Sequence, residues 1–236
     1  MEIPTGAAAW DQLINSTNTS YEYIPVVSGT YNYKCTPHFA GGMVGSFIVT
    51  DPQFISVDLK VFLEGPFDIG SISTTLADEG LVPLDQPYNP ALPYFGNNKP
   101  VWIHTGNENV ASIPAGVVDW IIVEFRDADN AAAASSATTM SRNVYFITSG
   151  GSIVDLDGVS LPLLKFIPQQ GLFSVLYHRN HLAVMNSNPL TDGGGGIATY
   201  DFTMDAGKFY GGNSGSTEIT PGIWGMTLGI VTEIIC

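Results

Sequence analysis

Apolar and polar positions alternate with a period of two along much of the chain, and Gly, Pro, Asn and Asp separate the alternating runs. This pattern is typical of β-strands, whose successive side chains point to opposite faces of a sheet. The runs are short and rich in β-branched and aromatic residues. The predicted strands are residues 21–25, 30–35, 43–50, 56–63, 117–125, 143–148, 172–178 and 198–202.

Residues 117–126 differ from the other runs because they are apolar on both faces, which predicts a central strand. Long amphipathic helical patterns are missing from the sequence. Residues 127–140 are rich in Ala and Ser and lack an apolar stripe, so they form either a short helix or a surface loop. The fold class predicted is all-β, built from sandwiches.

A domain boundary is expected near residues 50–54, where Asp51 and Pro52 end one strand before alternation resumes at Ile55. Residues 1–52 would make about half of a small sandwich. Residues 55–228 are long enough for a complete sandwich with large loops, and residues 84–100 are expected to be one long ordered loop.

Composition and charge exclude several functions. The chain is 44% hydrophobic and 13% charged, as expected for a globular protein. Acidic residues outnumber basic residues 22 to 8, which argues against nucleic-acid binding and against docking on anionic lipid. No apolar run is long enough for a membrane span, and the first residues lack the features of a signal peptide. The two cysteines, Cys35 and Cys236, give no disulfide framework.

The segment from residue 29 to 49 holds candidate metal ligands. Cys35, His38 and Met43 supply a thiolate, an imidazole and a thioether, which are three of the four donors of a blue-copper site. Thr36 and Pro37 would stiffen the turn between two strands. The alternative is ordinary packing, because a cysteine in a strand is usually a small buried hydrophobic residue.

The surroundings of these ligands favour copper. The segment GTYNYKCTPHFAGGMVGSFIV resembles the C-terminal part of the cupredoxins of plastocyanin or pseudoazurin type. The resemblance covers about residues 3–50 and implies a partial Greek-key sandwich with copper at Cys35, His38 and Met43. The matching positions are Gly29, Tyr31, Tyr33, Cys35, Pro37, His38, Gly42, Met43 and Gly45.

The same resemblance implies a fourth ligand, a histidine shortly before the segment that corresponds to residues 3–7. The chain has no histidine before His38. We therefore expect the chain to begin just after that ligand and to bind copper weakly or not at all. In the parent protein we expect type 1 copper binding, one-electron transfer to a redox partner protein, and a secreted or cell-surface location.

Residues 55–225 resemble a β-rich module found beside cupredoxin-like and calcium-binding modules in large secreted bacterial proteins. No catalytic residues follow from that resemblance, and no enzyme activity is expected. The stretches that carry the resemblance are LKVFLEGPF (59–67), ASIPAGVVDWIIVEFRD (111–127), GSIVDLDG (151–158) and LYHRNHLAVMN (176–186).

Within this region, His178 and His181 allow a metal site, although rings three positions apart on an extended strand would point to different faces. The alternative is a buried polar network in which Arg179 or Arg126 contacts a carboxylate such as Glu124 or Asp119. Glu124 and Arg126 share a face of the predicted central strand.

Two loops leave further alternatives. Asp155 and Asp157 either bind calcium or cap a turn, and capping is favoured. The aromatic residues of the long loop form either a binding face for a sugar or peptide, or a lid packed on the sandwich. A secreted adhesive or carbohydrate-binding protein without a functional metal site, with an extracellular glycan or surface ligand, is therefore the alternative function. These aromatic residues are Tyr88, Tyr94, Phe95 and Trp102.

Residues 229–236 fit poorly with what precedes them. They form either an apolar terminal strand or a non-native tail from a slipped reading frame, whose other frame would encode the start of an EF-hand-like calcium loop.

Overall fold

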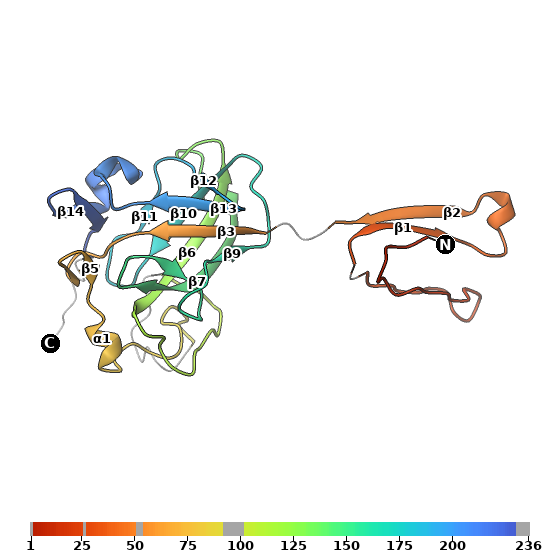
Figure 1. Cartoon of the computed structure of the whole chain (residues 1–236), viewed down its shortest axis with the longest axis horizontal. Helices are drawn as coiled ribbons and strands as arrows, with labels where there is room; N and C mark the ends of the chain where they lie inside the picture. Colours follow the sequence, from red (N-terminus) through yellow and green to blue (C-terminus); the bar gives the residue numbers. More distant parts are fainter. Residues whose placement is uncertain (1, 26, 51–53, 92–101, 230–236) are drawn as a thin grey trace. The chain divides into compact units, whose positions relative to one another are not determined.

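The computed structural model describes residues 2–25, 27–50, 54–91 and 102–229. The chain divides into two compact units, Met1–Gln53 and Phe54–Cys236. Both units are built from strands (Figure 1), so the predicted all-β class is confirmed. Among the described residues, the α-helical content is limited to α1 (Thr75–Asp78), a single turn.

The N-terminal unit is organised around one hairpin. Strands β1 (Gly29–Lys34) and β2 (Val44–Val49) pair antiparallel, with Gly29 opposite Val49 and Lys34 opposite Val44. The prediction of a strand at 21–25 was wrong, because these described residues form no strand. They lack a ladder partner, and alternation alone does not hold a strand without paired backbone groups.

Aromatic side chains form the core of this unit. Tyr31 is fully buried and its ring stacks on Phe47 of β2 at 5.0 Å between centroids. Trp10 stacks on Tyr23 at 4.1 Å and also contacts Tyr31, so the N-terminal segment packs over the hairpin. The Tyr31 hydroxyl donates to the Val27 carbonyl at 2.7 Å, which satisfies its polar end.

The C-terminal unit contains two larger sheets. A five-stranded sheet has the order β11-β10-β6-β7-β8, and a four-stranded sheet has the order β12-β13-β3-β9. Strand β13 runs parallel to β3, and the other pairs are antiparallel. The strands of the first sheet are β6 (Val117–Ala128), β7 (Thr139–Thr148), β8 (Ile153–Val154), β10 (Gly171–Tyr177) and β11 (Val184–Met185). Those of the second are β3 (Ile55–Lys60), β9 (Leu163–Leu164), β12 (Thr191–Gly194) and β13 (Ile197–Asp201).

Short elements complete this unit. Two further hairpins pair β4 with β5 and β14 with β15. Their bounds, with those of the 3-10 turns, are β4 (Phe67–Asp68), β5 (Ser71–Ile72), β14 (Ser216–Thr220), β15 (Ile223–Met226), η1 (Phe39–Gly41, in the N-terminal unit), η3 (Ser136–Thr138), η4 (Ala206–Lys208) and η5 (Gly212–Ser214).

Strand β6 separates two hydrophobic cores. One face, with Ile121, Val123 and Phe125, packs with residues of β3 and β13 between the two sheets. The other face, with Trp120 and Ile122, packs under the segment that follows α1. Because β6 lies at the centre of its sheet and is covered on both faces, the prediction of a central strand is confirmed. The Ala- and Ser-rich segment after β6 forms turns and η3, which confirms the loop alternative.

In the described part of the chain, no helix combines the length and the apolar character that crossing a membrane would need.

Candidate metal centre

Cys35, His38 and Met43 all lie in the loop that joins β1 to β2. Cys35 follows the last residue of β1, His38 is the N-cap of η1, and Met43 directly precedes β2. The backbone N–H of Cys35 donates to the Met43 carbonyl at 3.0 Å, which continues the ladder of the hairpin by one pair. The hairpin therefore brings the ends of the loop together.

Hydrogen bonds within the loop determine its path. The backbone N–H of Met43 donates to the His38 carbonyl at 3.3 Å, and that of His38 donates to the Cys35 carbonyl at 3.2 Å. Gly42 has a φ of 82° and caps η1 in the left-handed conformation, which glycine adopts without a steric penalty. This turn lets the chain reverse between His38 and Met43.

The thiol and the imidazole face each other. Cys35 Sγ and His38 Nδ1 are 3.3 Å apart. An ion about 2.3 Å from a thiolate and about 2.0 Å from an imidazole nitrogen would fit that separation with an angle of about 100° at the metal. The loop thus brings two of the three predicted ligands together, and their chemistry with a thioether suits copper.

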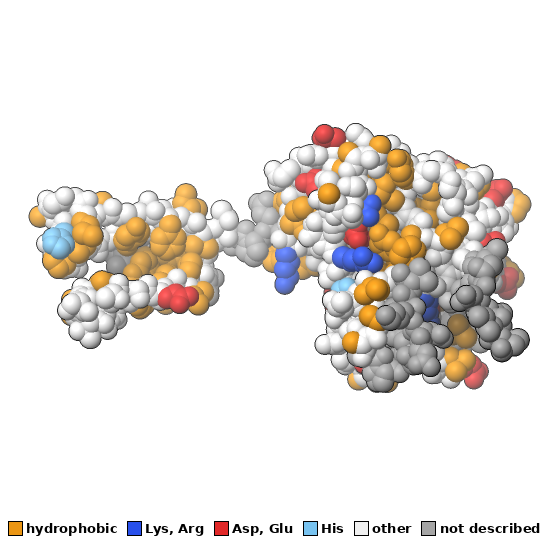
Figure 2. Space-filling model, turned by 180° about the vertical axis from the view of Figure 1, so that it is seen from behind, with side chains coloured by type: hydrophobic (Ala, Val, Ile, Leu, Met, Phe, Trp, Pro, Cys, Tyr) orange, Lys and Arg blue, Asp and Glu red, His pale blue; other side chains and the backbone are white. Residues whose placement is uncertain are grey.

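The loop is open to solvent. His38 is exposed, Cys35 is half-buried and Met43 is 58% exposed. Figure 2 shows hydrophobic side chains gathered on the visible face of this unit. Phe39 and Val44, which flank the ligands in sequence, are both exposed. Within the described residues, no three His, Cys, Asp or Glu side chains group so that they could hold a metal ion. Two strong donors and a thioether are what this loop supplies.

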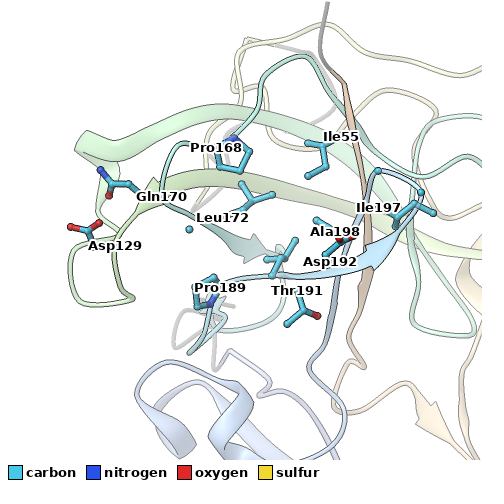
Figure 3. Close-up of a pocket in the computed structure, with 14 residues that line it drawn as sticks. Ile55, Asp129, Pro168, Gln170, Leu172, Pro189, Thr191, Asp192, Ile197 and Ala198 are labelled. Carbon is cyan, nitrogen blue, oxygen red and sulfur yellow. The ribbon is translucent and has the colours of Figure 1, made fainter.

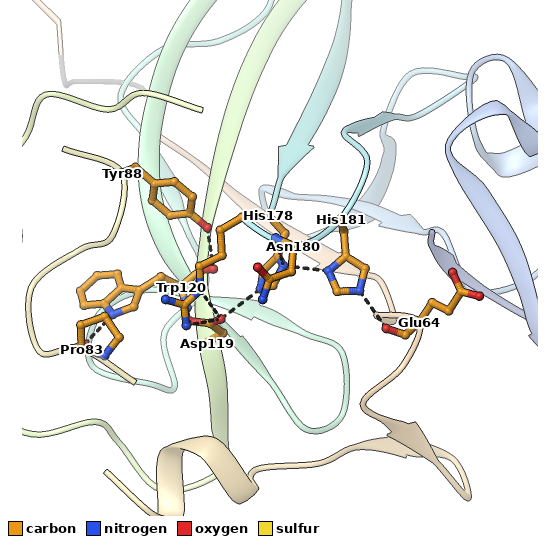
Figure 4. A network of polar contacts seen from close by, with 9 residues as sticks. Glu64, Pro83, Tyr88, Asp119, Trp120, His178, Asn180 and His181 are labelled. Carbon is orange, nitrogen blue, oxygen red and sulfur yellow. Dashed lines mark hydrogen bonds and ion pairs between the residues drawn. The ribbon is translucent and has the colours of Figure 1, made fainter. Parts of the chain in front are cut away.

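A second cluster of titratable groups lies where β6 begins and β10 ends (Figure 4). Asp119 accepts hydrogen bonds from Arg179 Nε and Nη2, both at 2.9 Å, and its Oδ2 is 3.2 Å from His178 Nε2. Asp119 and His178 are buried. The predicted polar network with Arg179 on Asp119 is therefore confirmed.

The expectation that the rings of His178 and His181 point to different faces was wrong. Strand β10 ends at Tyr177, and the backbone N–H of His181 donates to the His178 carbonyl at 3.1 Å in a turn. The turn places the two Nδ1 atoms 2.8 Å apart. His181 Nε2 lies 2.9 Å from the Glu64 carbonyl, and this partner could not be predicted from the sequence because every residue has a carbonyl oxygen.

Burial and charge shift the pKa values of this cluster. Burial raises the pKa of Asp119, but the hydrogen bond and charge of His178 and the charge of Arg179 outweigh it, so the pKa is lowered. Burial and the charge of His178 lower the pKa of His181 to about 4. Asp119 is thus held as a carboxylate and His181 as a neutral imidazole.

Glu124 and Arg126 form a second ion pair on β6. Arg126 Nε donates to Glu124 Oε1 at 2.7 Å, and Arg142 of β7 lies 3.5 Å from Glu124 Oε2. Thr139 also donates to Glu124 at 2.9 Å. Through Thr139 and Arg142, Glu124 therefore links β6 to β7.

The aromatic loop packs inward at the positions that the structure describes. Tyr88 is fully buried and its hydroxyl donates to the Trp120 carbonyl at 2.8 Å. The ring of half-buried Trp102 lies 4.8 Å from that of Tyr177. These two residues favour the lid over the binding face, whereas Tyr94 and Phe95 lie outside the described residues.

A surface cavity in the C-terminal unit is a further candidate for a binding site (Figure 3). It has a volume of about 670 Å³, and Ile55, Asp129, Gln170 and Asp192 are among the residues that line it. None of its lining residues is a cysteine or a histidine. Asp157 accepts hydrogen bonds from the backbone N–H groups of Val159 and Ser160 at 2.9 and 2.8 Å. The carboxylate therefore caps a turn, as favoured from the sequence.

Comparison with known proteins finds one family model that matches part of the first unit. Residues 6–50 match the family model described as copper binding proteins, plastocyanin/azurin family. No curated protein and no solved structure matches the chain significantly. The match contains Cys35, His38 and Met43, so these residues lie in a cupredoxin-like segment.

Proposed function

We propose that Cys35, His38 and Met43 bind copper and that the completed site transfers single electrons. The observation that carries the proposal is the loop itself. It places a cysteine sulfur and an imidazole nitrogen 3.3 Å apart inside a segment that matches the plastocyanin/azurin family model. Copper bound to such donors is stable in both oxidation states.

The hairpin supports this function by limiting movement of the ligands. Cys35 and Met43 are joined by a backbone hydrogen bond of 3.0 Å at the end of the ladder. Ligands fixed in this way change position little when the charge at the site changes, which favours fast electron transfer. Tyr31 also limits movement of the hairpin, because its buried ring stacks on Phe47 and holds β1 against β2.

The site needs one more imidazole than the N-terminal unit contains. The four histidines of the chain are His38, His104, His178 and His181, and one of these precedes residue 54. We infer that the second imidazole comes from outside residues 1–53. Without that imidazole, copper binding at the Cys35 loop is weak, and an added imidazole strengthens it.

A redox partner protein and a secreted or cell-surface location belong to the same proposal. Phe39, Met43 and Val44 are 53%, 58% and 60% exposed beside the ligands, which gives a partner an apolar surface close to the metal. Electron transfer requires such close approach. An extracellular glycan or surface ligand for the C-terminal unit is the alternative, and the inward packing of Tyr88 weakens it.

The test is a Cu(II) titration of the full chain, with and without imidazole in the buffer. We expect an intense visible charge-transfer band with imidazole and a weak band or none without it. Cys35→Ser should abolish the band, whereas Cys236→Ser, which changes the other cysteine, should keep it. A band that survives Cys35→Ser, or that never forms under either condition, would contradict the proposal.

A further inference from the structure

The outer ring nitrogens of His178 and His181 both face hydrogen-bond acceptors. His178 Nε2 faces Asp119 Oδ2 at 3.2 Å, and Arg179 holds that carboxyl as an anion. His181 Nε2 faces the Glu64 carbonyl at 2.9 Å. Neither oxygen has a hydrogen to donate, so both Nε2 atoms have to carry one. The tautomer of each ring is therefore determined by its outer partner.

The other ring nitrogens, Nδ1 of His178 and Nδ1 of His181, face each other, and each has a lone pair. When both rings are neutral, neither Nδ1 carries a hydrogen, yet the two atoms are 2.8 Å apart. Two lone pairs at that distance repel each other unless a cation lies between them. The backbone N–H of Asn180, 3.3 Å from His178 Nδ1, reaches one of the two nitrogens and leaves the other without it.

From this arrangement we propose that His178 and His181 form a two-imidazole site for a divalent transition-metal ion, separate from the loop of Cys35. A metal about 2.0 Å from each nitrogen would have an angle of about 90° between them. That angle suits the tetragonal geometry of Cu(II) or Ni(II) better than the tetrahedral geometry of zinc. Binding would replace the long Asn180 hydrogen bond.

The partners of the two rings are those that metal-binding histidines commonly have. Such a histidine usually donates its other N–H to a carboxylate or a backbone carbonyl, which orients the ring and raises its basicity. Asp119 and the Glu64 carbonyl occupy these two roles (Figure 4).

A cavity gives the site room for further ligands. It has a volume of about 180 Å³ and is lined by both histidines together with Ser73, Thr75 and Leu76. The described residues place no third His, Cys, Asp or Glu with this pair in a metal-binding group. Water in the cavity would therefore complete the coordination, and such positions can exchange with small oxygen or nitrogen ligands.

The test uses the full chain without an affinity tag and with Cys35→Ser, which removes the thiolate of the first site. We expect one Cu(II) per chain, with an electron paramagnetic resonance spectrum split by two imidazole nitrogens. His178→Ala and His181→Ala should each remove that two-nitrogen splitting. His104→Ala, which removes an imidazole paired with Glu108 at 2.9 Å, should leave it unchanged.

A second measurement covers variants that fold poorly. Ni(II) should raise the midpoint of thermal unfolding of the Cys35→Ser chain, and His181→Gln should abolish the increase. Asp119→Asn should weaken metal binding about 10- to 100-fold, because it changes the partner of His178 and not a ligand. The inference is overturned if the Cys35→Ser chain shows no nitrogen-split signal, or if the signal persists in both histidine variants. Neither result bears on the band assigned to Cys35.

Discussion

Acidification should destabilise the C-terminal unit through His181. Burial, the largest cause, and the charge of His178 lower the pKa of His181 from 6.5 to about 4, although the Glu64 carbonyl opposes this shift. The unfolded chain takes up a proton near the ordinary pKa, whereas the folded chain takes it up only near 4. Between these two values the unfolded state binds more protons, so stability falls as the pH falls.

The size of this effect follows from the shift. A difference of about 2.5 pKa units corresponds to about 3 kcal/mol of unfolding free energy. The contribution is fully present above about pH 6.5 and is lost progressively down to about pH 4. Asp119, whose carboxyl pKa is lowered, acts in the same direction but at lower pH, because its contribution is lost only as the pH falls through its folded value.

The assay is urea unfolding at several pH values between about 7 and 4, in EDTA, followed by the fluorescence of buried Trp120. His181→Gln can still donate to the Glu64 carbonyl but cannot titrate, so its unfolding free energy should vary less with pH. His38→Gln replaces an exposed histidine of the other unit and serves as the control. Equal pH dependence in the wild type and in His181→Gln would show that the reasoning about His181 is wrong.

Three further changes test other parts of the structure. Asp119→Ala leaves Arg179 and His178 without their carboxylate and should cost about 3–5 kcal/mol in urea unfolding, and a cost under about 1 kcal/mol would contradict the network. Tyr31→Ala removes the buried ring of the N-terminal unit and should cost about 3–5 kcal/mol, against about 1 kcal/mol for Tyr31→Phe, measured through Trp10 fluorescence; equal costs would contradict the ring's role. Gly42→Ala should cost about 1 kcal/mol and weaken copper binding, because its φ of 82° disfavours a Cβ; an unchanged copper titration would show that the turn does not position the ligands.

Much of the fold could be predicted from the sequence because strand periodicity is a local property. The predicted central strand, residues 117–126, lies at the centre of its sheet in the structure. Residues 21–25 have the same alternation but no strand, since pairing depends on a neighbour that periodicity does not reveal. Alternation therefore identified strands only where the tertiary structure provided a partner.

The two candidate metal sites show the same division. The spacing of Cys35, His38 and Met43 could be read directly, because all three ligands lie in one loop that its flanking strands close. The contact between His178 and His181 could not be predicted from the sequence, because β10 ends at Tyr177 and a turn follows. Glu64 is more than a hundred residues from His181 in sequence, and nothing in the sequence distinguishes its carbonyl from any other.

The sequence by itself therefore determined the all-β class, the central strand and the donor set of the Cys35 loop. Each of these depends on residues that are neighbours along the chain. Only the tertiary structure decided that Tyr88 is a buried part of the lid and that two imidazoles share one gap. Both outcomes depend on burial and on backbone groups contributed by distant segments, whose positions are determined when the sheets pack.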